Sequence, residues 1–147
     1  MYDNIKRFST DYLTGTIGIT DSVAYRSQLL SIVIDISMKD GFHLYGQPLP
    51  EGYIPFKVAV AANRNFTVDD FMFPKTTEFE IASLGETFSV LPEKLNLKTF
   101  MRIINKPKAG HYTVNVTLTF QACNDKICLA PADLKFDFPL RIINEEL

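Results

Sequence analysis

Two segments near the C-terminal end of the chain alternate strictly between apolar and polar residues. In the first segment the apolar positions are Tyr112, Val114, Val116, Leu118 and Phe120. In the second they are Leu134, Phe136, Phe138, Leu140 and Ile142. A period of two is typical of a strand with one buried face, whereas a helix would require apolar residues three and four positions apart. The two segments therefore predict an antiparallel strand pair and a fold built on β-sheet.

Similar strand signals recur along the chain, and no long stretch keeps a helical period. Alternating apolar residues mark strands at 30–37, 56–60 and 95–103, and residues 62–94 predict short strands and long loops. We expect the strand at 95–103 to form a three-stranded meander with the two C-terminal segments. The pattern predicts an all-β fold, and a β-sandwich more than a barrel.

The length and composition indicate one globular domain covering residues 1–147. Of the 147 residues, 46% are hydrophobic and 22% are charged, which is typical of a folded domain that buries roughly 70% of its unfolded-chain surface. The first 25 residues carry weaker signals. We expect them to be peripheral, with an edge strand around residues 16–20.

The two cysteines, Cys123 and Cys128, lie in the loop between the two alternating segments. They are therefore expected at the tip of a hairpin, and the strand phase places Cys123 on the polar face. A disulfide that closes a loop of about six residues stabilises a fold by roughly 2 kcal/mol, about half the effect of closing a sixty-residue loop. Such a bond favours a local or chemical role, while a simple structural pin stays open as an alternative.

Charge and hydropathy limit the partners and the compartment. The net charge of −2 combines 15 basic with 17 acidic residues, which predicts no attraction to nucleic acid or anionic lipid. No run approaches the roughly 18 apolar residues of a membrane span, and residues 1–7 lack the apolar core of a signal peptide. A chain that begins at the first residue of a mature protein would also lack an export signal or a membrane anchor. Paired cysteines would be kept reduced in a cytosol unless catalytic, but could stay oxidised outside it.

Two motifs together resemble one known family. The segments Asp40-Gly-Phe-His-Leu-Tyr45 and Phe120-Gln-Ala-Cys-Asn-Asp-Lys-Ile-Cys-Leu-Ala-Pro131 are similar to the N-terminal periplasmic domain of the thiol:disulfide interchange protein DsbD, over about Gln28 to Ile142. The resemblance implies an immunoglobulin-like β-sandwich in the periplasm, the redox-relay domain of a protein-disulfide reductase. Its implied partners are a thioredoxin-like or membrane reductase on one side, and disulfide isomerases or cytochrome c maturation proteins on the other, reached through transient mixed disulfides.

The same resemblance implies a role for each cysteine. Cys128 corresponds to the cysteine that forms mixed disulfides with partners, and Cys123 to the resolving cysteine. The sequence departs from the family pattern in its Cys-x4-Cys spacing, one residue shorter than in the best-known member, and in Ala130, where proline is frequent. The loop geometry is therefore expected to differ.

The family also places aromatic residues and a cap loop over its cysteines. His43 and Tyr45 match the aromatic positions beside the site, although both residue types are as readily explained by core packing. The nearest equivalent of the cap is the segment 82–88, in which Leu84 or Phe88 could supply an apolar lid.

Two other classes of function compete with the relay. Cys123, Cys128, His43 and His111 include the residue types of a zinc site, but zinc knuckles usually have Cys-x2-Cys spacing, and His111 lies about 40 Å of extended chain from Cys123. We therefore expect no metal and no cofactor. The remaining alternative is a non-catalytic immunoglobulin-like binding module with a structural disulfide.

Overall fold

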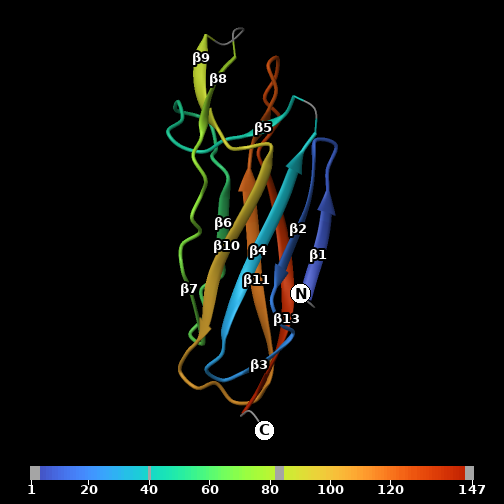
Figure 1. The fold of residues 1–147 in the computed structure, drawn as a ribbon, viewed down its shortest axis with the longest axis vertical. Coiled ribbons are helices and arrows are strands. Elements are labelled where there is room, and N and C mark those ends of the chain that lie inside the picture. Colours follow the sequence, from blue (N-terminus) through green and yellow to red (C-terminus); the bar gives the residue numbers. More distant parts are fainter. Residues whose placement is uncertain (1–3, 40, 82–84, 145–147) are drawn as a thin grey trace.

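A computed structural model describes residues 4–39, 41–81 and 85–144 (Figure 1). These residues form strands and loops without a helix, so no helix in the described part of the chain could span a membrane. The strands within them are β1 (Asn4–Ser9), β2 (Leu13–Ile19), β3 (Val23–Tyr25), β4 (Leu29–Met38), β5 (His43–Leu44), β6 (Lys57–Val60), β7 (Phe66–Val68), β8 (Thr77–Ile81), β9 (Glu86–Val90), β10 (Lys94–Ile103), β11 (Gly110–Phe120), β12 (Ala122–Cys123) and β13 (Ala132–Ile143).

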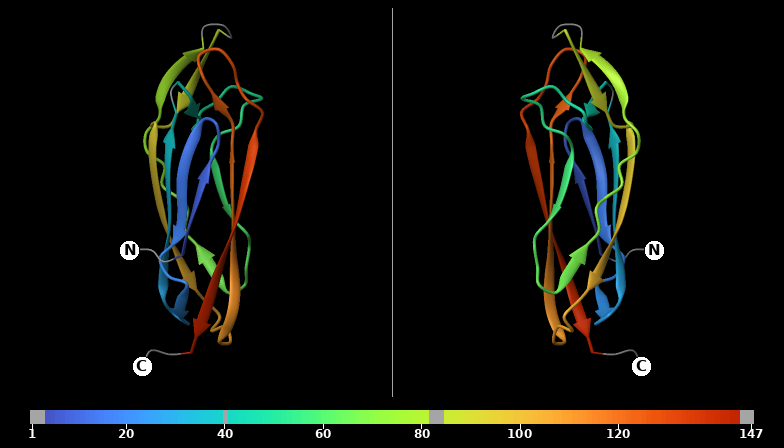
Figure 2. Two further views of the ribbon diagram at one scale, coloured as in Figure 1. Left: turned by 90° about the vertical axis from the view of Figure 1, so that its right-hand side faces the viewer. Right: turned by 90° about the vertical axis from the view of Figure 1, so that its left-hand side faces the viewer.

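The long strands form two sheets that pack face to face (Figure 2). One sheet has the order β1-β2-β4-β10-β7 and the other has the order β3-β13-β11-β6. Only β3 and β13 pair in parallel among the described strands, and the other pairs are antiparallel. Two short pairs, β12-β5 and β8-β9, lie at the end of the sandwich where β11 and β13 are joined (Figure 1).

The core lies between the two sheets and follows from the alternation in the sequence. The inward residues of β4, β10, β11 and β13 are buried and their neighbours are mostly exposed. The largest fully buried side chains of this main core include Phe120, Phe138, Ile32, Ile34 and Leu30. Burying a side chain of this size stabilises the fold by about 1.5–3 kcal/mol.

The predicted strand pair at the C-terminal end is confirmed. β11 and β13 pair antiparallel from Gly110 opposite Ile142 to Phe120 opposite Ala132. The predicted three-stranded meander is wrong, because β10 pairs with β4 and β7 in the other sheet. Residues 104–109 therefore carry the chain across the sandwich. A period of two shows that one face of a strand is buried. It does not show to which sheet the strand belongs, because each sheet of a sandwich buries one face.

The N-terminal segment is more central than predicted. β2 lies between β1 and β4, and its residues Leu13, Ile17 and Ile19 are fully buried in the core. The edge strand is β1, and the expectation of a peripheral strand at 16–20 is wrong. The apolar alternation of β2 is weak in the sequence because Gly15 replaces an apolar side chain on its buried face. A Cβ at this position would lie 2.3 Å from the ring of Phe8, so the close approach of β1 requires glycine here.

Candidate redox site

Cys123 and Cys128 are joined by a disulfide at the tip of the β11–β13 hairpin. The turn between them is organised by Asn124, whose Oδ1 accepts hydrogen bonds from the backbone N–H groups of Lys126 (2.9 Å) and Ile127 (2.8 Å). The Asn124 N–H also donates to the Ile127 carbonyl at 2.9 Å. Asparagine favours such turns because its side chain can satisfy the backbone two residues on. The turn sets the two cysteines opposite each other as an antiparallel bridge.

The two sulfur-bearing residues differ in exposure. Cys123 is 0% exposed, whereas Cys128 is half-buried. The prediction that Cys123 lies on a polar, solvent-facing side is therefore wrong. The long strand β11 ends at Phe120, and the following β12 pairs with β5 under a second layer of side chains. Cys128 is thus the more accessible member of the pair.

The segment 43–46 connects the cysteines to the hairpin β8–β9. On one side, His43 lies opposite Cys123 and Leu44 opposite Ala122. On the other side, the Leu44 carbonyl accepts a hydrogen bond from the Leu91 N–H (2.8 Å), and the Gly46 N–H donates to the Ser89 carbonyl (2.9 Å). Because backbone hydrogen bonds run from β12 through this segment to the end of β9, the hairpin has a fixed position over the disulfide.

The disulfide lies in a cluster of mainly aromatic side chains, which we call the cap cluster and which includes both cysteines. Its members are Tyr45, Phe88, Val90 and Cys123, which are buried, and Leu49, Tyr53, Phe79 and Cys128, which pack against them. The rings of Tyr45 and Phe88 stack at 5.1 Å, and Tyr53 meets Phe88 edge-on at 4.7 Å. The structure thus brings together Tyr45 and Phe88 of the sequence-based candidates, while Leu84 lies outside the described residues.

Tyr45 contacts the accessible cysteine directly. Its hydroxyl lies 3.4 Å from Cys128 Sγ and donates to that sulfur, because a disulfide sulfur carries no proton. Burial raises the pKa of the Tyr45 phenol well above its usual value. The phenol therefore keeps its proton at neutral pH. A protonated donor beside Cys128 favours the thiolate of that residue when the disulfide opens.

His43 packs against the cap hairpin. Its ring lies 4.4 Å from that of Phe79, and the side chain is half-buried. Burial lowers the pKa of His43, and the nearby charge of Glu93 opposes that shift without cancelling it. The folded protein therefore favours the neutral imidazole.

The lowered pKa of His43 predicts a pH-dependent stability. An unfolded histidine has a pKa of about 6.5, so below that pH the unfolded chain binds more protons than the folded one. The contribution of His43 is fully present above this value and is lost as the pH falls from it through the lower pKa of the folded protein. Urea unfolding at about pH 7.5 and pH 5 should show a larger loss of stability for the natural chain than for His43→Gln. Equal losses would mean that His43 titrates normally.

Sequence reasoning missed two residues that organise the site. Gln121 is buried, accepts a hydrogen bond from the Ile54 N–H (3.1 Å) and donates one to the Leu129 carbonyl (3.2 Å). It ties the cysteine loop to the loop that carries Tyr53. Gln121 belongs to the recognised cysteine motif, so its place beside Cys123 was a usable signal. Tyr53 lies in a loop without periodicity, and nothing in the sequence pattern pointed to it.

The residues considered for a zinc site are not gathered in one place. His111 lies at the opposite end of β11 from the cysteines, opposite Arg141. The two cysteines are bonded to each other. Within residues 4–39, 41–81 and 85–144, no three His, Cys, Asp or Glu side chains form a group that could hold a metal ion.

Comparison with known families gives one match that covers both cysteines. Residues 19–139 match the family described as "Thiol:disulfide interchange protein DsbD, N-terminal". The chain belongs to this family. The matched region contains both recognised motifs and agrees closely with the expected span of Gln28 to Ile142. As a member of the DsbD N-terminal family, the chain is a thiol:disulfide interchange domain with one cysteine pair.

One solved structure supports the fold, and a second is reported beside it. The N-terminal periplasmic domain of ScsB from Proteus mirabilis aligns with a TM-score of 0.62 and 13% identity over 90% of this chain and 49% of that one. The chain thus corresponds to about half of the ScsB structure. The reduced N-terminal domain of DsbD from Neisseria meningitidis aligns with a TM-score of 0.46 and 17% identity over 73% of this chain and 74% of that one. Curated protein sequences gave no match. The all-β, immunoglobulin-like sandwich expected from the sequence is confirmed.

Proposed function

We propose that this domain is a periplasmic thiol:disulfide relay in which Cys123 and Cys128 are the redox couple. It would accept reducing equivalents from a thioredoxin-like or membrane reductase and pass them to disulfide isomerases or cytochrome c maturation proteins. Membership of the DsbD N-terminal family supports the type of chemistry and the compartment. The unequal exposure of the two cysteines carries the assignment of roles.

In the first half of the cycle the domain is reduced. A thiolate of the donor attacks Cys128 Sγ, the Cys123–Cys128 bond breaks, and Cys123 leaves as a thiolate. A second donor thiol then attacks the mixed disulfide, so the donor becomes a disulfide and the domain a dithiol. Two electrons pass to the domain, and protons from the donor thiols or solvent complete the two thiols.

In the second half the domain is oxidised. The Cys128 thiolate attacks the disulfide of the acceptor and forms a mixed disulfide, which the Cys123 thiolate resolves. The Tyr45 hydroxyl, which lies beside Cys128 Sγ, would stabilise the attacking thiolate. Ile127 is 53% exposed in the turn between the cysteines and supplies an apolar contact for either partner.

The cap cluster supports selectivity in this scheme. Cys123 is buried beneath Tyr45 and Phe88, so a partner reaches Cys128 first and Cys123 only from within the domain. Small oxidants and reductants are kept from the buried sulfur in the same way. A binding module with a structural disulfide would not need this difference between its two sulfurs.

The reduction potential separates these two functions. We expect the Cys123–Cys128 couple to equilibrate at about −270 to −120 mV, the range of exchange proteins, because it must both accept and donate electrons. Thiol labelling across a graded dithiol buffer measures this value. A potential below about −300 mV would instead favour the binding module, because structural disulfides resist reduction.

A further inference from the structure

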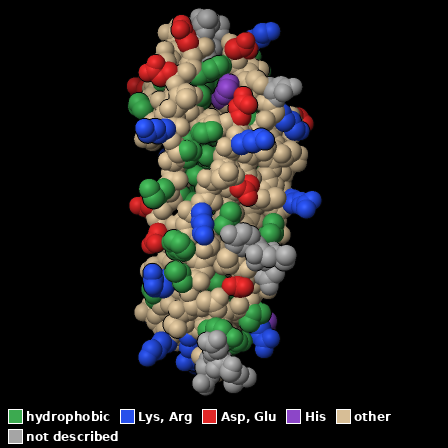
Figure 3. All heavy atoms as spheres, viewed as in Figure 1, with side chains coloured by type: hydrophobic (Ala, Val, Ile, Leu, Met, Phe, Trp, Pro, Cys, Tyr) green, Lys and Arg blue, Asp and Glu red, His purple; other side chains and the backbone are tan. Residues whose placement is uncertain are grey.

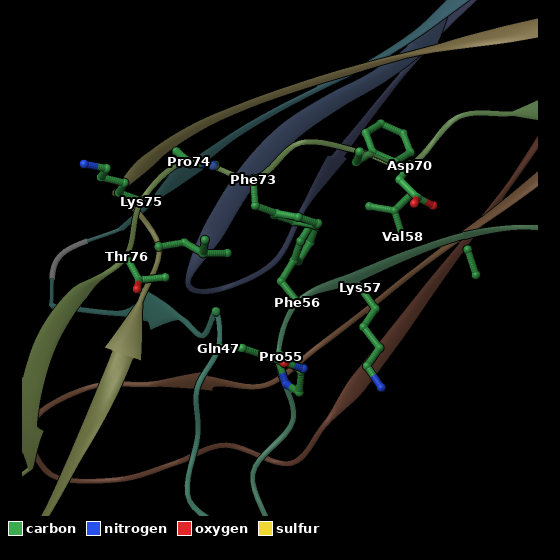
Figure 4. Close-up of a pocket in the computed structure, with 14 residues that line it drawn as sticks. Gln47, Pro55, Phe56, Lys57, Val58, Asp70, Phe73, Pro74, Lys75 and Thr76 are labelled. Atoms are coloured by element: carbon green, nitrogen blue, oxygen red, sulfur yellow. The ribbon is translucent and has the colours of Figure 1, made fainter.

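A groove runs along one side of the sandwich (Figure 4). It encloses about 920 Å³ between β6 and the segment 70–76 that follows β7. At one end it is lined by Gly46 and Leu91, the residues next to Tyr45 and Val90 of the cap cluster. The groove therefore begins beside the candidate redox site and extends along the open edge of the four-stranded sheet.

β6 is the edge strand of that sheet and pairs with β11. The Ala61 N–H donates to the Asn115 carbonyl at 2.9 Å, which sets the phase of the ladder. In an antiparallel pair alternate residues bond to the partner strand, so positions 57, 59 and 61 face β11 with their backbone groups. The N–H and C=O groups of Val58 and Val60 consequently point away from β11 and toward the groove.

The floor of the groove is apolar. The rings of Phe56 and Phe73 meet edge-on at 6.1 Å across it, and Figure 4 shows both pointing into the space between the two segments. Phe73 is 44% exposed and its neighbour Met72 is 86% exposed. Large apolar side chains left open to water beside a concave surface are typical of a binding site.

The opposite side of the sandwich is closed. There the Asn4 side chain donates to the Pro139 carbonyl at 2.8 Å, and the rings of Phe8 and Phe136 lie 5.3 Å apart. β1 thus bridges the two sheets. On the groove side, the segment after β7 is instead held to its own sheet: the Asp69 N–H donates to the Phe100 carbonyl, and Thr99 Oγ1 donates to the Asp69 carbonyl.

From these features we propose that the groove binds an extended segment of a partner polypeptide, which adds to the sheet as a strand beside β6. The outward backbone groups of Val58 and Val60 would pair with the segment's main chain, and its alternate apolar side chains would enter the pocket of Phe56 and Phe73. The remaining side chains of the segment would lie on the outer face of the sheet, beside the exposed side chains of Lys57 and Ala59.

The chemistry of the groove favours an extended peptide over other occupants. Unpaired N–H and C=O groups in a row are matched by another main chain, and neither a lipid tail nor an apolar small molecule could satisfy them. Acidic and basic side chains are mixed over the face seen in Figure 3. The groove itself is lined by Lys57, Lys75 and Asp70, so its charge does not select a strongly acidic or strongly basic occupant. The site would act beside the disulfide and does not depend on its reactivity.

The proposal can be tested with random octapeptides displayed on phage and the whole oxidised domain as target. We expect enrichment of peptides with apolar residues at alternate positions, and the best peptide is then synthesised with a fluorescein label. Val58→Pro removes the outward N–H without breaking a bond to β11, so it should weaken binding about fivefold to tenfold. The matched control Val58→Thr keeps the N–H and should bind within about twofold.

Two further measurements keep the test decisive if Val58→Pro unfolds. Phe73→Ala alters a half-exposed ring and should weaken the peptide about tenfold. In the complex, amide exchange should slow at Val58 and Val60 but not at Ala59. Absence of enrichment, or binding that neither substitution affects, overturns the proposal. A dimer of the free domain that Val58→Pro abolishes in sedimentation would replace the peptide with a second copy, and so would also overturn it.

Discussion

Replacing Cys128 with serine is expected to abolish disulfide-linked complexes with thioredoxin-like proteins, whereas replacing Cys123 should make them accumulate. In Cys128→Ser the remaining Cys123 is fully buried within the cap cluster, so a partner sulfur has no access to it. In Cys123→Ser the accessible Cys128 can still form a mixed disulfide, but no internal thiol resolves it. The difference between the two variants should be close to all-or-none.

The measurement uses a thioredoxin-like bait that lacks its own resolving cysteine, with non-reducing electrophoresis to count linked complexes. A second readout is the rate at which each single thiol reacts with an aromatic disulfide reagent. Cys123→Ser should react quickly and Cys128→Ser slowly, because exposure controls thiol reactivity as strongly as pKa does. Equal trapping and equal rates in the two variants would refute the assigned roles.

Removing the ring of Phe88 is expected to produce the second large effect, on stability and on the disulfide together. Phe88 is 1% exposed and contacts the rings of both Tyr45 and Tyr53. Phe88→Ala should therefore cost about 3–5 kcal/mol of unfolding free energy. It should also expose Cys123, so reduction of the disulfide by dithiothreitol should become at least about tenfold faster.

Phe100 provides the matched control for this variant. Its ring is 44% exposed on β10, with Lys98 Nζ 5.4 Å from its centre, and it has no place in the cap cluster. Phe100→Ala should cost about 1 kcal/mol or less and leave the reduction rate unchanged. If both variants are reduced at the natural rate, Phe88 does not shield the disulfide.

The fold was predictable wherever the alternation was long and unbroken. β4, β10, β11 and β13 each have ten or more residues with one apolar face, and the strands expected from them are present. β2 was misjudged because Gly15 interrupts its apolar face. The sheet to which β10 belongs could not be read from its sequence, because either sheet would bury the same residues.

The candidate site was partly predictable for a different reason. Cys123 and Cys128 are close in sequence, and a hairpin between two alternating strands had to place them together at its tip. Tyr45 and Phe88 lie far from them along the chain, and only resemblance to a family pointed to either. The burial of Cys123 could not be read from the phase of β11, since that strand ends before the cysteine.

The sequence by itself determined the local structure of this protein: two-residue periodicity along the strands, the hairpin, the cysteine turn and the family to which these belong. Tertiary structure alone decided which strands share a sheet, which sulfur is accessible, and where a free strand edge meets an apolar groove. The reason is physical. Periodicity is set by backbone geometry within one segment, whereas exposure and edges depend on which distant segments pack together, and that is decided by the burial of the whole core.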